Sequence, residues 1–267
     1  MSKDPPLNRL APAQRHTRKT AAAVSRGAQL LRLSSESACP YLPERWERKL
    51  WTVLDPTDRD GFAALNRAGF RRSGRILYRP ACAGCEACRP TRVPAASFAP
   101  SRTQRRIMKR NADLSFSIAP PRATSEHFAL FSRYVDARHW DGGMAGMQQS
   151  EFAQMVEDAP DGAALAEWRD RDGLLCAGCI LDDDGEGLSA VYSYFDPDAP
   201  KRSLGVFVVV SLLDWARRIG RAHLYLGYTI VETHKMAYKQ SFRPAEHLAG
   251  GVWRRAGAED ETVAEEA

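Results

Sequence analysis

The sequence predicts an α+β protein, and the pattern of its second half is the main reason. That half reads as three β-like runs, an apolar helix, a strand and a last helix, in this order. These elements are expected at residues 163–169, 174–181, 188–195, 205–219, 223–227 and 233–241. A strongly basic first half with a cysteine cluster adds a smaller part of different character. Strands and helices that segregate in this way build a layered α+β fold.

The order of elements in the second half is the one shown by an acetyltransferase-like (GNAT) domain. We therefore expect that domain at residues 123–255, behind a small basic module at 38–122 that contains the cysteine cluster. Residues 1–37 are expected to be a disordered lead, and residues 256–267 an acidic tail.

The charge distribution supports this division of the chain. Residues 1–122 hold 24 Lys and Arg against 9 Asp and Glu, a net charge of +15, whereas the rest has a net charge of −10. Opposed charges indicate two functional parts. Clustered cations favour a polyanion such as nucleic acid, and a solvated basic surface without a partner is the alternative.

Within the basic module, local patterns predict two helices and two strands. Apolar residues at helical spacing predict a helix over residues 43–54. Asp58 is placed to cap a second helix, and Gly69 is placed to end it. Residues 70–78 and 92–98 are β-like and flank the cysteine cluster.

The clearest local signal begins at Ser101. Ser101 and Gln104 have the spacing of a capping box, which starts a helix. Five cations follow at positions i, i+3, i+4, i+7 and i+8, so they share one face and repel one another. A solvated face normally mixes both signs, so a stripe of one sign predicts phosphate binding. Its members are Arg102, Arg105, Arg106, Lys109 and Arg110.

The start of the second half is helical. Residues 119–124 are predicted to be a linker, and Thr124 or Ser125 is placed to cap a helix that reaches about residue 140. A shorter helix is predicted at residues 150–158.

Four cysteines form a candidate metal site. Cys82, Cys85 and Cys88 are separated by two residues each, and thiolates at this spacing can converge on one metal ion. Cys39 would complete four ligands. Zinc and an iron–sulfur cluster both suit this pattern, and the alternative is a set of buried, reduced cysteines.

Two polar clusters are candidates for substrate binding or catalysis. Lys235, Tyr238 and Lys239 share a helix face, where they would bind a carboxylate or the phosphates of an acyl donor; a solvated helix end is the alternative. Arg138 and His139 form the second cluster. His139 is a candidate general base, and the alternative is an ordinary surface or core histidine.

Other functional classes are disfavoured by the sequence. Residues 202–207 half-match the turn by which acetyltransferases hold the coenzyme A pyrophosphate, but Phe207 stands where a small residue is needed. A nucleophile elbow, a P-loop and a dinucleotide fingerprint are all missing from the sequence. No apolar run approaches the ~20 residues of a membrane span. A cytoplasmic protein with no membrane partner is therefore expected.

Several motifs, taken together and in this order, resemble the arginyl-tRNA–protein transferase family. The resemblance runs from about Cys39 to Pro244, and chain length and cysteine pattern resemble its bacterial branch, the aspartate/glutamate leucyltransferases. The motifs are Cys-Pro-Tyr-Leu at 39–42, Gly-Phe-Arg-Arg-Ser-Gly at 69–74, Tyr-Arg-Pro at 78–80, the basic segment at 98–111, Ser-Leu-Gly at 203–205, Tyr-Leu-Gly-Tyr at 225–228 and Lys-Met-Ala-Tyr-Lys at 235–239.

The resemblance implies an aminoacyltransferase. Such an enzyme moves leucine from Leu-tRNA to the N-terminal amine of proteins that begin with Asp or Glu, which marks them for degradation in the N-degron pathway. It implies no required cofactor for the transfer. Arginine as the donated residue is the main alternative. A coenzyme A-dependent N-acetyltransferase and a non-enzymatic zinc-bearing RNA-binding module are the others.

The resemblance also suggests roles for individual residues. His139 and Tyr228 are candidates for a general base. Arg138, Lys235 and Lys239 are candidates for the cation that selects acidic acceptors. Some relatives carry further cysteines that are implicated in an iron–sulfur cluster. Leu42 replaces one of these, so only the local spacing supports a metal here.

Overall fold

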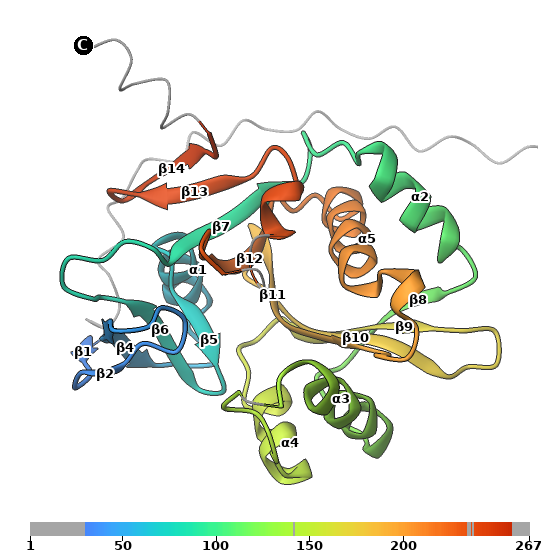
Figure 1. Cartoon of the computed structure of the whole chain (residues 1–267), viewed down its shortest axis with the longest axis horizontal. Coiled ribbons are helices and arrows are strands. Elements are labelled where there is room, and N and C mark those ends of the chain that lie inside the picture. Colours follow the sequence, from blue (N-terminus) through green and yellow to red (C-terminus); the bar gives the residue numbers. More distant parts are fainter. Residues whose placement is uncertain (1–29, 141, 234–235, 237, 258–267) are drawn as a thin grey trace, which may run out of the picture. The chain divides into compact units, whose positions relative to one another are not determined.

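The computed structural model of the chain describes residues 30–140, 142–233, 236 and 238–257. From Leu31 onward the described residues form one compact unit. Its centre is an eight-stranded sheet in the order β14-β13-β7-β12-β11-β10-β9-β8 (Figure 1). The strands of the sheet are β7 (Arg89–Pro94), β8 (Ser115–Ala119), β9 (Ala163–Arg169), β10 (Leu175–Asp183), β11 (Gly187–Phe195), β12 (His223–Thr229), β13 (Glu246–Ala249) and β14 (Val252–Arg255).

Helices cover both faces of this sheet (Figure 1). On one face, α5 (Leu204–Arg218) and α2 (Arg102–Arg110) enclose a core that includes Trp168, Leu188 and Leu212. On the other face, α3 (Ser125–Arg138) and α4 (Gln149–Glu157) enclose a second core. The α+β class is therefore confirmed, as is the predicted order of three strands, a helix and a strand in β9, β10, β11, α5 and β12.

The predicted helix starts are confirmed as well. Asp58 caps α1 (Arg59–Arg67) by accepting a hydrogen bond from the Gly61 N–H. Ser101 and Gln104 form the predicted capping box of α2, and Thr124 forms another box at α3. Each cap satisfies backbone N–H groups that a helix cannot pair internally.

The helix predicted at residues 43–54 is wrong, because this segment forms the short strand β3 (Trp46–Glu47) and then β4 (Lys49–Val53). Leu50, Thr52 and Leu54 alternate along the chain, and all three face the small core of the module. The same apolar residues thus fit a period of two as well as a helix. Pairing with neighbouring strands favours the strand over the helix. β4 lies between β1 (Arg32–Leu33) and β6 (Ile76–Pro80), and β5 (Arg71–Ser73) completes this four-stranded sheet. The remaining short strand, β2 (Ser37–Ala38), pairs with β3.

The main sheet takes strands from both sides of residue 122. β7 pairs with β12 and β13, and β8 pairs with β9. The sequence predicted no strand at β8, and it placed the strand at β7 three residues too late. The domain boundaries at residues 37, 122 and 255 stay predictions. Residues 1–29 of the predicted lead and 258–267 of the predicted tail lie outside the described residues, and the described end of the lead holds β1 and the start of β2.

The predicted last helix at residues 233–241 is described only in part, because residues 234, 235 and 237 lie outside the described part. Of the described residues, Met236 is α-helical and Tyr238–Ser241 form a turn of 3₁₀ helix, η2. Among the described helices, none is long and apolar enough to cross a membrane.

Candidate active site

A gap between two parallel strands defines the candidate site. β11 and β12 pair only at the start of each strand, from Gly187 opposite His223 to Ser189 opposite Tyr225. Beyond that point both strands continue, to Phe195 and Thr229, without pairing to each other. Backbone groups at the parting of parallel strands are open to a ligand, as at the strand ends of many α/β sheets.

Gly227 forms a bulge at this parting. The register of β12 against β7 shifts between Tyr225 and Gly227, and Gly227 has a φ of +80°. Glycine adopts this left-handed conformation without the strain that a side chain would cause. A Cβ at this position would lie 3.6 Å from Arg71 Nε and 3.7 Å from Lys239 Nζ.

Two cations thus lie over the bulge. Arg71 comes from β5 of the module, and its guanidinium donates to the carbonyl of Ala190 on β11 over 3.4 Å. Lys239 comes from η2, and its ammonium donates to the carbonyl of Tyr228 on β12 over 2.7 Å. Burial, and next the charge of Arg71, lowers the pKa of Lys239 from its usual range to about 7.

Aromatic side chains line the α3 side of β11. Arg138 lies over the ring of Phe195, 5.6 Å from its centroid, and its side chain is exposed. His139 caps the C-terminus of α3, where its Nε2 lies 3.3 Å from the Tyr134 hydroxyl. Burial raises the pKa of Tyr134 above its usual range. The structure therefore brings Arg138 and His139 together beside the end of β11.

Tyr228 connects β12 to the module. Its hydroxyl lies 3.0 Å from the carbonyl oxygens of both Gly69 and Tyr78 and donates its proton there. Burial raises the pKa of this hydroxyl, so Tyr228 stays protonated at neutral pH. Its predicted part in catalysis stays a prediction, and a role in holding the module is evident from its contacts.

The remaining predicted substrate-binding residues are Tyr238 and Lys235. The Tyr238 side chain is 42% exposed, and its ring meets Phe242 edge-on with a centroid separation of 6.1 Å. Lys235 lies outside the described residues.

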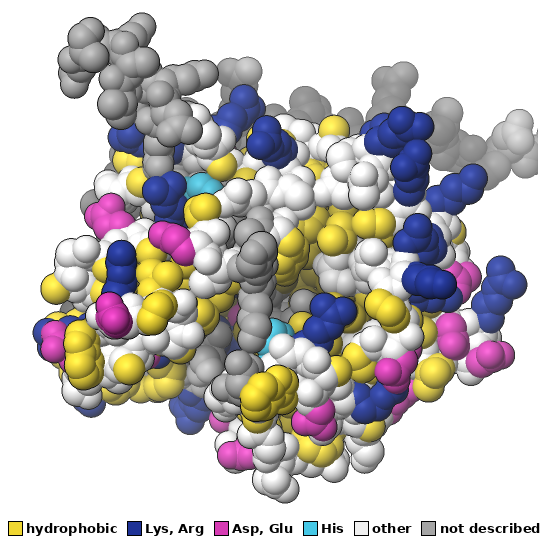
Figure 2. Space-filling view, viewed as in Figure 1, with side chains coloured by type: hydrophobic (Ala, Val, Ile, Leu, Met, Phe, Trp, Pro, Cys, Tyr) yellow, Lys and Arg dark blue, Asp and Glu magenta, His cyan; other side chains and the backbone are white. Residues whose placement is uncertain are grey.

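The basic face of α2 is exposed as predicted. All five of its cations are accessible, whereas Gln104 and Ile107 on the opposite face are buried. Figure 2 shows dark-blue side chains gathered over this helix. Arg110 donates to the Lys201 carbonyl, which places the end of α2 beside the start of α5. A polyanion bound along α2 would thus lie close to the N-terminus of α5.

The turn before α5 shows no open phosphate site. Arg202 forms an ion pair with Asp113 at 2.7 Å, which lowers the pKa of that carboxyl. Phe207 is buried, and its ring meets Trp168 edge-on with a centroid separation of 6.3 Å. Phe207 therefore belongs to the core, as its size suggests.

The four module cysteines lie near one another, and all are reduced. Burial, and next the nearby thiols of Cys39, Cys82 and Cys85, raises the pKa of Cys88 to about 12. Arg45 donates to Cys85 Sγ over 3.1 Å. Within the described part of the chain, however, no group of three or more His, Cys, Asp or Glu side chains is arranged to hold a metal ion. The metal at these cysteines stays a prediction.

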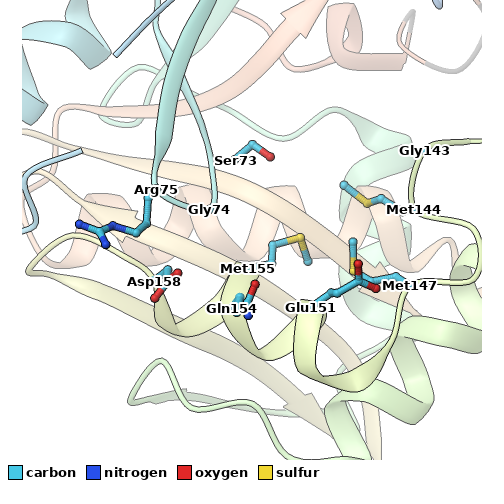
Figure 3. Close-up of a pocket in the computed structure, with 10 residues that line it drawn as sticks. All are labelled: Ser73, Gly74, Arg75, Gly143, Met144, Met147, Glu151, Gln154, Met155 and Asp158. Carbon is cyan, nitrogen blue, oxygen red and sulfur yellow. The ribbon is translucent and has the colours of Figure 1, made fainter. Parts of the chain in front are cut away.

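A cavity of about 420 Å³ opens between the β5–β6 turn and α4. Figure 3 shows Gly74 at the tip of this turn above α4, with Met144 and Met147 on the segment that precedes the helix. Three thioether side chains and two carboxylates line this cavity together with one arginine. They belong to Met144, Met147, Met155, Glu151, Asp158 and Arg75.

Comparison with known proteins identifies the family. The N-terminal part of the arginine-tRNA-protein transferase family matches residues 37–106, and its C-terminal part matches residues 126–249. The aspartate/glutamate leucyltransferase of Paramagnetospirillum magneticum is 48% identical over 81% of this chain and 89% of its own length. The chain belongs to the arginine-tRNA-protein transferase family.

Other members of this transferase family are similarly close. The aspartate/glutamate leucyltransferase of Granulibacter bethesdensis is 44% identical over 85% of both chains. That of Gluconacetobacter diazotrophicus is 45% identical over 85% of this chain and 88% of its own.

Solved structures resemble the chain more distantly. L-PGS from Bacillus licheniformis is 15% identical, with a TM-score of 0.48 over 74% of this chain and 63% of its own. FemX is 10% identical, with a TM-score of 0.46 over 80% of this chain and 85% of its own.

Arg71 is a residue of the candidate site that the sequence did not single out. It is one of four arginines in a basic β-like run, and composition gave no reason to separate it from Arg72, Arg75 and Arg79. Its place in the Gly-Phe-Arg-Arg motif was the only available signal. In the structure, Arg71 and Arg72 point to opposite faces of β5, as neighbouring residues of a strand do. Arg71 faces the bulge at Gly227, and Arg72 faces Asp182.

Proposed function

We propose that this chain transfers leucine from Leu-tRNA to the N-terminal amine of proteins that begin with Asp or Glu. The observation that carries the proposal is the 48% identity to a relative named aspartate/glutamate leucyltransferase over 89% of its length. A product with leucine at its N-terminus would then be marked for degradation. Charged tRNA is made and used in the cytoplasm, so the proposed reaction belongs there.

The geometry is compatible with the two substrates of this reaction. The exposed cations of α2 would hold the tRNA through its phosphates, without reading its sequence. The end of α2 lies beside the start of α5, so the charged 3′ end would reach the gap between β11 and β12 from that side.

The proposed chemistry forms one peptide bond. The acceptor's α-amine attacks the carbonyl carbon of the aminoacyl ester, and the bond to the terminal ribose oxygen of the tRNA breaks. A proton leaves the amine, and one is returned to that ribose oxygen. A free α-amine has a pKa of about 7.7–8.0, so a fraction is already neutral at pH 7. Positioning would therefore supply much of the acceleration.

A general base would add a further factor of ~10²–10⁴. His139 lies at the end of α3 beside Tyr134. We retain it as the candidate base. Tyr228, the second predicted candidate, lies on the strand that borders the gap, but its hydroxyl stays protonated and donates to the carbonyls of Gly69 and Tyr78, which does not suit a base. The terminal hydroxyl of the tRNA is a further candidate for sharing the proton transfer.

One experiment tests the donor and the acceptor together. An Asp-starting peptide is incubated with the protein and a mixture of aminoacyl-tRNAs, and the product is weighed by mass spectrometry. We expect the addition of one leucine residue. Addition of arginine would favour the second candidate donor, which the name of the matching family supports. An N-acetylated peptide is the matched control, because it offers no amine and should stay unmodified.

A parallel reaction with acetyl-CoA separates the remaining enzymatic alternative. Acetylation of the peptide without any aminoacyl addition would overturn the proposed function. Binding of tRNA without any modification of the peptide would instead favour the non-enzymatic RNA-binding module.

A further inference from the structure

We propose that Arg71 and Lys239 together bind the carboxylate side chain of the acceptor's first residue, and that Gly227 keeps the space for it. The inference rests on the proposed function and assigns its acceptor specificity to named residues. Lys239 is one of the three cations expected to make this contact, and Arg71 is assigned in place of the other two, Arg138 and Lys235.

The first argument is the shared position of the two cations. They come from segments far apart in the sequence, β5 and η2, and both reach the point above Gly227 where a Cβ would stand, at 3.6 and 3.7 Å. A side chain there would fill the space between them. Because position 227 carries no side chain, the two cations flank the same small space above the bulge.

The second argument is that neither cation has a carboxylate partner in the described part of the chain. Among the described residues, Arg72 on the opposite face of β5 forms an ion pair with Asp182, whereas Arg71 and Lys239 form no ion pair. Their hydrogen bonds go to the carbonyls of Ala190 and Tyr228. Two like charges with little water around them repel strongly, and an anion between them would relieve that cost.

The third argument is the number of unused donors. A guanidinium has five N–H donors and an ammonium has three, and each group spends one donor on a backbone carbonyl. Enough donors remain for a carboxylate to be bound at both oxygens. Arginine's planar fork suits such bidentate binding.

The location favours a carboxylate over a phosphate. Both cations lie at the gap between β11 and β12, while the exposed cations that suit a tRNA backbone lie on α2. The carbonyls of Ala190 and Tyr228 accept from the two cations, and they would repel the larger negative charge of a phosphate more than that of a carboxylate. Arg138, by contrast, is exposed over Phe195, where water weakens discrimination between an acid and its amide.

The test compares transfer to peptides that begin with Asp, Glu or Asn. In Arg71→Gln we expect the ratio of kcat/KM for Asp over Asn to fall about tenfold or more, mainly through a higher KM for the Asp peptide. Lys239→Gln should shift this ratio in the same direction. Arg71→Lys keeps the charge but loses the fork, and it should retain an intermediate ratio. Arg67→Gln is the matched control, because Arg67 lies on α1 and pairs with Glu186 at the surface.

An unchanged Asp/Asn ratio in Arg71→Gln would overturn the proposal. If the KM for aminoacyl-tRNA rose at the same time, the two cations would be a phosphate site. A protein that only misfolds would change the rates for both peptides together, and circular dichroism identifies that case.

A binding measurement separates this proposal from the proposed function. Fluorescence anisotropy with labelled Asp and Asn peptides needs no transfer. If the wild type transfers nothing but binds the Asp peptide more tightly, and Arg71→Gln removes that preference, the assignment stands and the activity does not. Equal binding of both peptides by the wild type would overturn the assignment.

Discussion

At the scale of single residues, the ion pair between Arg72 and Asp182 joins the module to the main sheet. Its side chains are 1% and 0% exposed, and they form two hydrogen bonds of 2.7 and 2.9 Å. Arg72 also donates to the carbonyls of Met155 and Asp158 at the end of α4. One side chain on β5 thus satisfies groups on both β10 and α4.

Removing one partner of this pair should be costly. Arg72→Met leaves the Asp182 carboxylate buried without its cation, and we expect a loss of ~3–5 kcal/mol in the free energy of unfolding. The measurement is equilibrium unfolding in urea. The double variant Arg72→Met/Asp182→Leu should recover a large part of the loss, since no unpaired charge remains. A double variant less stable than Arg72→Met would contradict this explanation.

Lys239 predicts a specific dependence of stability on pH. Its pKa is about 7 in the folded protein, against about 10.4 in the unfolded chain. Between these values the unfolded chain binds more protons, so this residue makes stability rise with pH, by roughly 1.4 kcal/mol per unit at most. Below pH 7 both states are protonated, and the full cost of the buried charge is present.

Comparison with Lys239→Met isolates this contribution. The wild type should gain stability relative to the variant as the pH rises from 7 to 10, measured by urea unfolding at each pH. Gln240→Met, at the neighbouring exposed position, is the matched control and should leave the slope unchanged. A constant difference between wild type and Lys239→Met over this range would show that the lysine titrates normally.

The sequence could indicate part of the candidate site. Lys239 and the five cations of α2 were found because their spacing is local and helical. Arg71 was not found, because its contact with Ala190 spans 119 residues. The space above Gly227 depends on a bulge in the pairing of β12 with β7. The local periodicity of a sequence does not predict the register in which two strands pair.

At the scale of elements, helix boundaries were predictable where caps are local. The capping boxes of α2 and α3 fixed their starts, and alternating or continuous apolar runs located β9, β10 and β11. The strand β4 was missed because its residues fit two periods, and only pairing with β1 and β6 distinguishes them. Such pairing comes from segments outside any local window.

The basic face of α2 should determine tRNA affinity. In Arg105→Glu/Arg106→Glu we expect weaker binding of tRNA and a shallower dependence of log K on log salt, by about two in slope if each arginine neutralises one phosphate. The measurement is filter binding or anisotropy over a series of salt concentrations. Both residues are exposed, so the fold should persist.

The matched control for this helix is Arg217→Glu/Arg218→Glu. These arginines lie in the last turn of α5, are exposed, and pair with Asp214. This variant changes the net charge by the same amount at another place. An equal loss of affinity in both double variants would assign tRNA binding to overall charge rather than to α2.

At the scale of the whole molecule, the described residues from Leu31 onward should unfold as one cooperative unit. Contacts between the module and the main sheet are extensive: Asn66 donates to Asp184 over 2.7 Å, Tyr228 donates to Gly69, and β7 is a strand of that sheet. Each of these would have to break for either part to open alone. The predicted boundary at residue 122 would then separate functions without separating folding units.

Hydrogen exchange measured by mass spectrometry in increasing urea tests this cooperativity. We expect peptides from β6 and from β10 to lose protection with the same free energy, because both strands open only in global unfolding. Tyr228→Phe removes the hydroxyl that binds Gly69 and Tyr78, and it should lower that common value by ~1 kcal/mol. If β6 lost protection well before β10 in the wild type, the module would be a separate folding unit. The acceptor site would then be one that assembles when the module docks, because Arg71 lies on β5 and Gly227 on β12.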